Sequence, residues 1–231
     1  MFLGHFGLGF GVKTRQSHVS LGTLFLAAQF ADLLWPTLLL LGVEQVAVQP
    51  ERLVKLAFIS YPISHSLLMD LLWGVMLGLG YWLLRRNLRG ALLVGLLVPS
   101  HWLLDLVVHV PDLPLYPGAF PLLGLGLWNH PLATQIVEAL LFGGGLLLYV
   151  RRTQARSRAG RYGLWTLVAL LALIHVSSLL GPPPSDVTVI AWASQVMWLL
   201  IILAYWVDRN RVPRPAPAAA ATRPAFVPSS V

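Results

Sequence analysis

Six runs of about twenty apolar residues follow one another along this chain, and they constrain its fold more than any other feature. They lie at 20–41, 63–84, 90–109, 131–150, 162–181 and 188–207. A helix rises about 1.5 Å per residue, so each run is long enough to cross the ~30 Å hydrocarbon core of a bilayer. The 231 residues are 57% hydrophobic and only 11% charged, unlike a soluble domain. We therefore predict an all-α fold, a polytopic membrane bundle with about six transmembrane helices.

The two ends of the chain differ from this central region of 20–207. Residues 1–19 begin with an apolar stretch that is too short to span a membrane and lacks the pattern of a signal peptide. We interpret it as an interfacial or re-entrant segment. Residues 208–231 are rich in Pro, Ala and Arg and predict a disordered cytoplasmic tail.

Basic residues predict the orientation of the bundle. Fourteen of the 16 precede the first run, follow the second or fourth, or follow the sixth. Only Arg52 and Lys55 lie on the other side. By the positive-inside rule both termini are cytoplasmic. The net charge of +7 then belongs to short loops at the inner rim, where it favours contact with membrane lipids. Nucleic acid is not expected as a partner.

Ionisable residues inside the apolar runs predict a polar site. Asp32, Asp70, Asp105, His101 and Glu138 all fall in the outer half of their spans, about 6–13 Å below the outer face by helical rise. Such residues are costly in a bilayer and usually mark function. We expect them to line a cavity open to the outer side, although a single carboxylate can also serve only as an interhelical hydrogen bond.

The most specific prediction from these residues is a metal site. His101 and Asp105 lie one helical turn apart on one face, which suits two ligands of one ion. The chain has no cysteine, so a transition-metal site must use imidazole and carboxylate groups. Asp32 and His65 complete the expected set. His5 is a further candidate that would have to re-enter from the cytoplasmic side.

Local features around these ligands suggest a built site. Pro62 is expected in the first turn of the second span, so that His65 projects from a helix start. Pro99 is expected to open the third span just before His101. The loop 111–130 is nearly uncharged, which predicts either a lid over the site or a lipid-embedded connector.

Three other histidines receive weaker assignments. His109 is as well suited to the outer rim as to a ligand role, and His175 is expected to make an interhelical packing contact. His18 is predicted to lie at an exposed helix end.

The order of these motifs resembles a bacterial family. FLGHFG with His5, FADLLWP with Asp32, ISHSLL with His65 and SHWLLDL with His101 and Asp105 are similar to the YdjM-like membrane-bound metal-dependent hydrolases. The resemblance covers roughly residues 1–110. It implies a multi-pass protein of the bacterial inner (plasma) membrane that binds a divalent metal ion, with zinc as the first choice.

Together these observations predict a membrane-embedded metal-dependent hydrolase acting on a lipid or lipid-linked ester or phosphoester. Glu138 and Asp70 are the candidate general bases. The chain lacks one acid of the family's first motif and its HRG-like lead into the second. A transporter with a carboxylate-lined cavity and a scaffold without catalysis therefore stay as alternatives. The oligomeric state, the metal and the substrate are left open.

Overall fold

The computed structural model describes residues 1–13 and 18–214. Arg15 and the tail from 215 to 231 lie outside the described residues. The helices are α1 Leu3–Gly11, α2 Leu21–Ala28, α3 Phe30–Leu40, α4 Leu67–Arg85, α5 Leu88–Val108, the 3-10 helix η1 Leu127–Asn129, α6 Pro131–Arg152, α7 Arg158–Leu180, α8 Val187–Ser194 and α9 Val196–Arg209. The strands are β1 Gln45–Val48, β2 Leu56–Ser60, β3 Thr153–Ala155 and β4 Arg211–Pro213.

The long helices confirm the prediction of a polytopic membrane bundle. Five spans meet the length and hydropathy of a membrane crossing, with α8 and α9 counted together, and α2 with α3 makes a sixth if the pair is one span. Between 17% and 44% of each of the five spans is buried within the protein. Their remaining apolar sides are free to contact lipid, as expected of a multi-pass membrane protein.

The first predicted span is broken, and the last one has only a local interruption. The first was expected to be continuous, but α2 and α3 meet at 57° on either side of Gln29. Gln29 is fully buried, and its amide Nε2 lies 3.5 Å from the carbonyl oxygen of Phe2 on the neighbouring chain segment. The last span is divided at Gln195 between α8 and α9. The first break places Asp32 in the first turn of a new helix.

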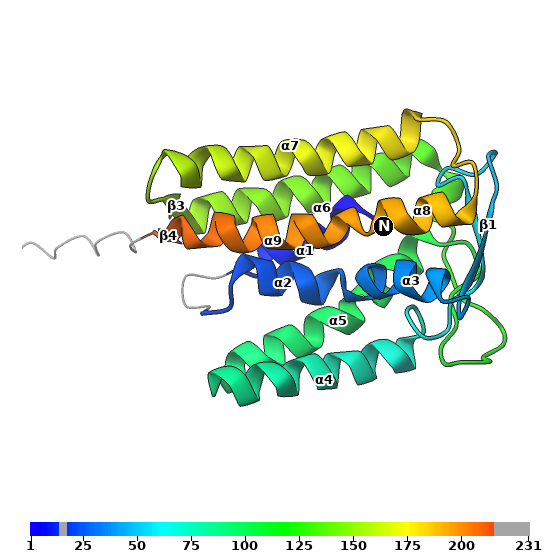
Figure 1. The fold of residues 1–231 in the computed structure, drawn as a ribbon, viewed down its shortest axis with the longest axis horizontal. Coiled ribbons are helices and arrows are strands. Elements are labelled where there is room, and N and C mark those ends of the chain that lie inside the picture. The colour runs from blue at the N-terminus through cyan, green and yellow to red at the C-terminus, as the bar shows by residue number, and fades with distance from the viewer. Residues whose placement is uncertain (14–17, 215–231) are drawn as a thin grey trace, which may run out of the picture.

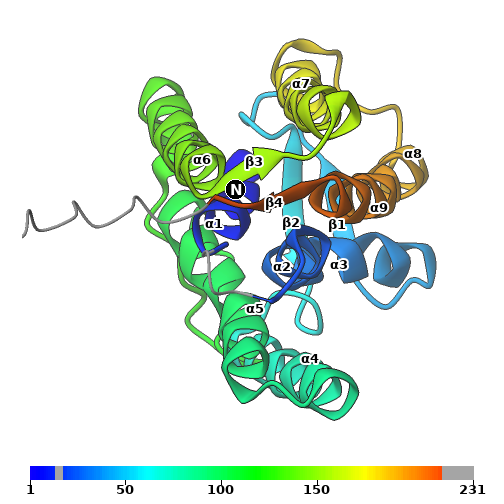
Figure 2. The same cartoon turned by 90° about the vertical axis from the view of Figure 1, so that its left-hand side faces the viewer.

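Helix α1 lies at the centre of the bundle, surrounded by α2, α5 and α6 (Figure 2). Its close approach to α6 depends on glycine. A Cβ on Gly145 of α6 would lie 1.9 Å from the Gly7 carbonyl oxygen, and a Cβ on Gly7 would lie 2.5 Å from the Leu141 carbonyl oxygen. Small residues of this kind let two membrane helices pack backbone to backbone. This packing brings His5 beside α5, where its Nε2 lies 3.0 Å from Asp105 Oδ1.

The bundle has two distinct ends (Figure 1). One, which we call the hairpin end, carries the antiparallel strands β1 and β2 and the loop 110–130. The other, the arginine end, carries the short antiparallel pair β3 and β4. Neither pair of strands was predicted. Residues 208–214, assigned to the tail, instead complete α9 and form β4.

Helices α4 and α5 form an antiparallel pair on one side of the bundle (Figure 1). Gly74 of α4 packs against the carbonyl oxygen of Gly95 on α5, since a Cβ at position 74 would lie 2.4 Å from it. Glycine at position 74 thus lets α4 and α5 approach closely. Helix α4 starts at Leu67 with Ser66 as its cap, so His65 lies in the turn before the helix and not within its first turn as expected.

Candidate metal centre

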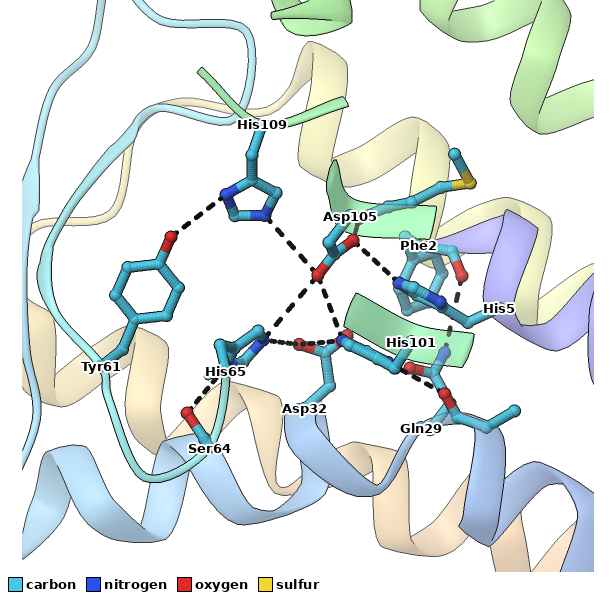
Figure 3. A network of polar contacts seen from close by, with 12 residues as sticks. Phe2, His5, Gln29, Asp32, Tyr61, Ser64, His65, His101, Asp105 and His109 are labelled. Atoms are coloured by element: carbon cyan, nitrogen blue, oxygen red, sulfur yellow. Dashed lines mark hydrogen bonds and ion pairs between the residues drawn. The ribbon is translucent and has the colours of Figure 1, made fainter. Parts of the chain in front are cut away.

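Residues far apart in the sequence meet in one network of polar contacts (Figure 3). Asp32 comes from the first turn of α3 and His65 from the turn before α4. His101 and Asp105 come from one face of α5. The His65, His101 and Asp105 side chains are at most 3% exposed, whereas that of Asp32 is 24% exposed. Asp32 is therefore the member of the cluster that a solute can reach most easily.

Four pairs of ligand atoms among these residues are about as far apart as two ligands of one ion. His65 Nε2 lies 3.3 Å from Asp32 Oδ1 and 3.9 Å from Asp105 Oδ2. His101 Nε2 lies 3.8 Å from Asp32 Oδ1 and 3.2 Å from Asp105 Oδ2. Tetrahedral ligands ~2.0–2.2 Å from a zinc ion are roughly 3.3–3.6 Å from one another. The described side chains therefore bring together the predicted donors at about the required separations.

His101 presents a free nitrogen to this point. Its Nδ1 lies 2.9 Å from the carbonyl oxygen of Ala28, which can only accept, so Nδ1 carries the proton and donates it. Nε2 then holds a lone pair. That atom is buried and makes no hydrogen bond among the described residues, although Asp105 is close. A buried acceptor without a partner is costly, and a metal ion would satisfy it.

His65 is oriented by a chain of hydrogen bonds. Its Nδ1 lies 2.6 Å from Ser64 Oγ, and Ser64 Oγ donates to Glu44 Oε2 at 2.6 Å. Glu44 Oε1 also accepts the backbone N–H groups of Ile63 and Ser64, both at 2.8 Å. Because the serine proton goes to the carboxylate, Ser64 accepts from His65 Nδ1. Nε2 of His65 is thereby left as the donor atom that faces the cluster.

His109 also belongs to the centre. From the sequence, a position at the outer rim and a role as a ligand were equally good interpretations of this residue. Its Nε2 lies 3.6 Å from Asp105 Oδ2, and its Nδ1 lies 2.8 Å from Asp112 Oδ1. Tyr61 donates to the same Asp112 oxygen at 2.8 Å. Burial raises the pKa of Tyr61, with the Asp112 charge adding to the effect, so the phenol keeps the proton that it donates. The spacing 101, 105, 109 was the sequence signal.

His5 lies on the other side of Asp105. Its ring stacks on that of His101 with centroids 3.7 Å apart, and its Nε2 lies 3.0 Å from Asp105 Oδ1. The amino nitrogen of Met1 contacts the same oxygen at 2.5 Å. Two triads among the described residues have the geometry to hold an ion: His5 with His101 and Asp105, and Asp32 with His65 and His101. His101 is shared by both.

The two candidate bases occupy different places. Glu138 on α6 accepts the backbone N–H of Phe2 at 3.1 Å with one oxygen and that of Gly4 at 3.0 Å with the other, so it caps the start of α1. Asp70 on α4 is fully buried, and neither of its oxygens has a hydrogen-bond partner among the described residues. Only Glu138 lines the cavity described next.

A cavity of about 620 Å³ extends from the cluster toward the hairpin end. Asp32, His65, Asp105 and His109 are among its polar lining residues. Its apolar walls come from the β1–β2 hairpin and from α7, α8 and α9, and they include Leu53, Val54, Leu56, Phe58, Leu173, Ile174, Ile190, Val196 and Met197. The volume suits a small-molecule site, typically ~300–1,000 Å³.

The remaining histidine in this region behaves as a packing residue. His175 Nε2 of α7 lies 2.7 Å from the Gln135 amide oxygen of α6, an interhelical hydrogen bond of the kind expected.

Comparison with known protein families, curated proteins and solved structures finds no match for this chain. The chain is thus a multi-pass membrane protein with a buried His/Asp cluster that could hold a metal ion.

Proposed function

We propose that this protein is a metal-dependent hydrolase of the bacterial inner membrane that acts on a lipid or lipid-linked ester or phosphoester. The motif order supports a distant place in the YdjM-like family. The observation that carries the proposal is the convergence of Asp32, His65, His101 and Asp105 donor atoms at 3.2–3.9 Å. The cluster also opens into a largely apolar cavity.

Each of the four residues has a definite task. His65 and His101 offer neutral Nε2 atoms because their Nδ1 protons are held by Ser64 and Ala28. Asp32 and Asp105 supply two negative charges that balance a divalent cation. Nitrogen and oxygen donors without thiolate suit zinc. A bound divalent ion would activate water at neutral pH and polarise an ester or phosphoester oxygen.

Glu138 is the general base that we favour. It lines the cavity, whereas Asp70 does not. Its two hydrogen bonds come from backbone N–H groups, which orient the carboxylate without protonating it. Asp32, the most exposed of the four ligands, is the one that water and substrate reach most easily.

Hydrolysis assays on purified protein test the proposal. Zinc-loaded protein should release p-nitrophenol from a long-chain ester or phosphoester, lose this activity on chelation and regain it with zinc. His101→Gln should abolish the activity, whereas His18→Gln, at an exposed residue of the arginine end, should retain it. Inactive zinc-loaded protein, or activity that survives both chelation and His101→Gln, would refute the proposal.

A carrier is the second candidate, and the broken first span favours it. Discontinuous helices with carboxylates beside the break are typical of ion-coupled transporters. Asp32 lies three residues after Gln29, at the 57° bend between α2 and α3. Metal content separates the two functions, because a carrier need not retain an ion through purification and dialysis.

A further inference from the structure

The charged groups that line the cavity are nearly all of one sign. Asp32, Asp105 and Glu138 contribute carboxylates, and no lysine or arginine occurs in the lining formed by residues 1–13 and 18–214. Two of these carboxylates would balance a divalent ion, and the charge of Glu138 is offset by the amino group of Met1, which also lines the cavity. The lining with a divalent ion is therefore balanced in charge, and it holds no surplus cation of the chain for an anionic substrate.

Cations close to the cavity are already engaged. Lys55 belongs to the β1–β2 hairpin, and its Nζ donates to the carbonyl oxygens of Ser178, Leu179 and Gly181 at 3.0, 2.8 and 2.7 Å, at the end of α7. The amino nitrogen of Met1 contacts Asp105. Neither group is available to an incoming phosphate without losing its present partners.

A helix start at the cavity is engaged as well. Exposed N–H groups at a helix N-terminus are a common phosphate site. Here the N–H groups of Phe2 and Gly4, at the start of α1, are bound by the Glu138 carboxylate. An anionic phosphoester would have to displace a carboxylate that belongs to the protein.

The polar groups on the cavity wall are otherwise uncharged donors and acceptors. Gln135 accepts from His175 through its oxygen, and its amide nitrogen makes no hydrogen bond to the described residues. Ser177 and Ser194 line the same wall. Such groups can bind an ester carbonyl, whereas a buried anion needs a positive partner.

From this distribution we infer that the substrate is an uncharged carboxylic ester of a long acyl chain, and not a phosphoester. This rests on the proposed function and selects one of its two substrate classes. The acyl chain lies against the hairpin, α7 and α8. Hydrolysis breaks the bond between the acyl carbon and the alkoxy oxygen. The acyl carbon receives the hydroxyl of a water molecule, and the alcohol receives the proton.

Binding of two probes that are not esters of a carboxylic acid tests the inference apart from catalysis. Radiolabelled 1-O-dodecylglycerol is uncharged, and dodecyl phosphate carries the same chain on an anion. In nanodiscs of uncharged lipid, zinc-loaded protein should bind the glycerol ether at least tenfold more tightly. Gln135→Lys, which adds a cation to the wall, should raise the affinity for dodecyl phosphate at least fivefold.

Two tryptophan substitutions on α8 test where the chain binds. Ala193→Trp fills the cavity and should reduce binding of the glycerol ether at least tenfold, whereas Val189→Trp, on the same helix outside the lining, should not. Equal or tighter binding of dodecyl phosphate by the parent, or equal effects of the two variants, would overturn the inference. The zinc content of the same samples separates failure of this inference from failure of the proposed function. If zinc-loaded protein prefers dodecyl phosphate, the inference fails and the proposed function stands.

Discussion

Ser64 provides the most specific test of how the centre is built, because its hydroxyl is the only described link between His65 and Glu44. Ser64→Ala removes the acceptor of the His65 Nδ1 proton, 2.6 Å away. The backbone N–H of residue 64, which Glu44 also binds at 2.8 Å, is retained. The turn should therefore keep its fold while the imidazole loses its orientation.

The magnitude follows from the position of this hydrogen bond behind a metal ligand. Loss of such an outer partner typically weakens metal affinity 10–100-fold. This corresponds to about 1.4–2.8 kcal/mol of binding free energy. We expect Ser64→Ala to fall in this range, and not to lose zinc altogether, because His101, Asp32 and Asp105 still supply donors.

The assay is zinc affinity by competition with a chromophoric chelator, in detergent, with unfolding followed on the same samples. Ser157→Ala is the control: Ser157 caps α7 by accepting the N–H of Gly160, far from the cluster in sequence and fold. It should cost about 1 kcal/mol of stability and leave zinc affinity unchanged. Parental zinc affinity in Ser64→Ala, or an equal loss in Ser157→Ala, would refute the reasoning.

Two further predictions concern the fold. Reporter fusions after Arg89 and Arg156 should be cytoplasmic and a fusion after Gly118 external, as the basic residues predict; the reverse pattern would move the centre to the inner half of the membrane. Gly145→Ala should destabilise the protein by roughly 1–3 kcal/mol, because its Cβ would meet the Gly7 carbonyl, while Gly144→Ala, with open space around it, should be close to neutral in thermal unfolding; equal effects would contradict the α1–α6 contact.

The sequence predicted the membrane spans well because length and hydropathy are local properties. It did not predict the break at Gln29, since glutamine is compatible with a helix and its contact with the Phe2 carbonyl is made across the fold. The central place of α1 also depends on a distant partner. The sequence shows Gly7 only as a small residue. Its contact with Gly145 in the fold explains why this position has no side chain.

The sequence predicted the ligands of the candidate centre but not the residues that orient those ligands. Asp32, His65, His101 and Asp105 stand out because ionisable groups are rare in apolar spans. Glu44 and Ser64 lie between spans, where polar residues are ordinary, and no spacing links Glu44 to His65. His109 had a signal, since it is two helical turns beyond His101, but its place at the rim gave it an equally good alternative.

Metal content of the purified protein tests the central claim most directly. After expression with zinc and dialysis, elemental analysis should find a stoichiometric divalent ion in the parent and in His175→Gln, and a sharp loss in Asp105→Asn. The asparagine keeps the size of the side chain but removes the anion, and thermal unfolding should show that the variant still folds. A metal-free parent, or folded Asp105→Asn protein with as much metal as His175→Gln, would contradict the account.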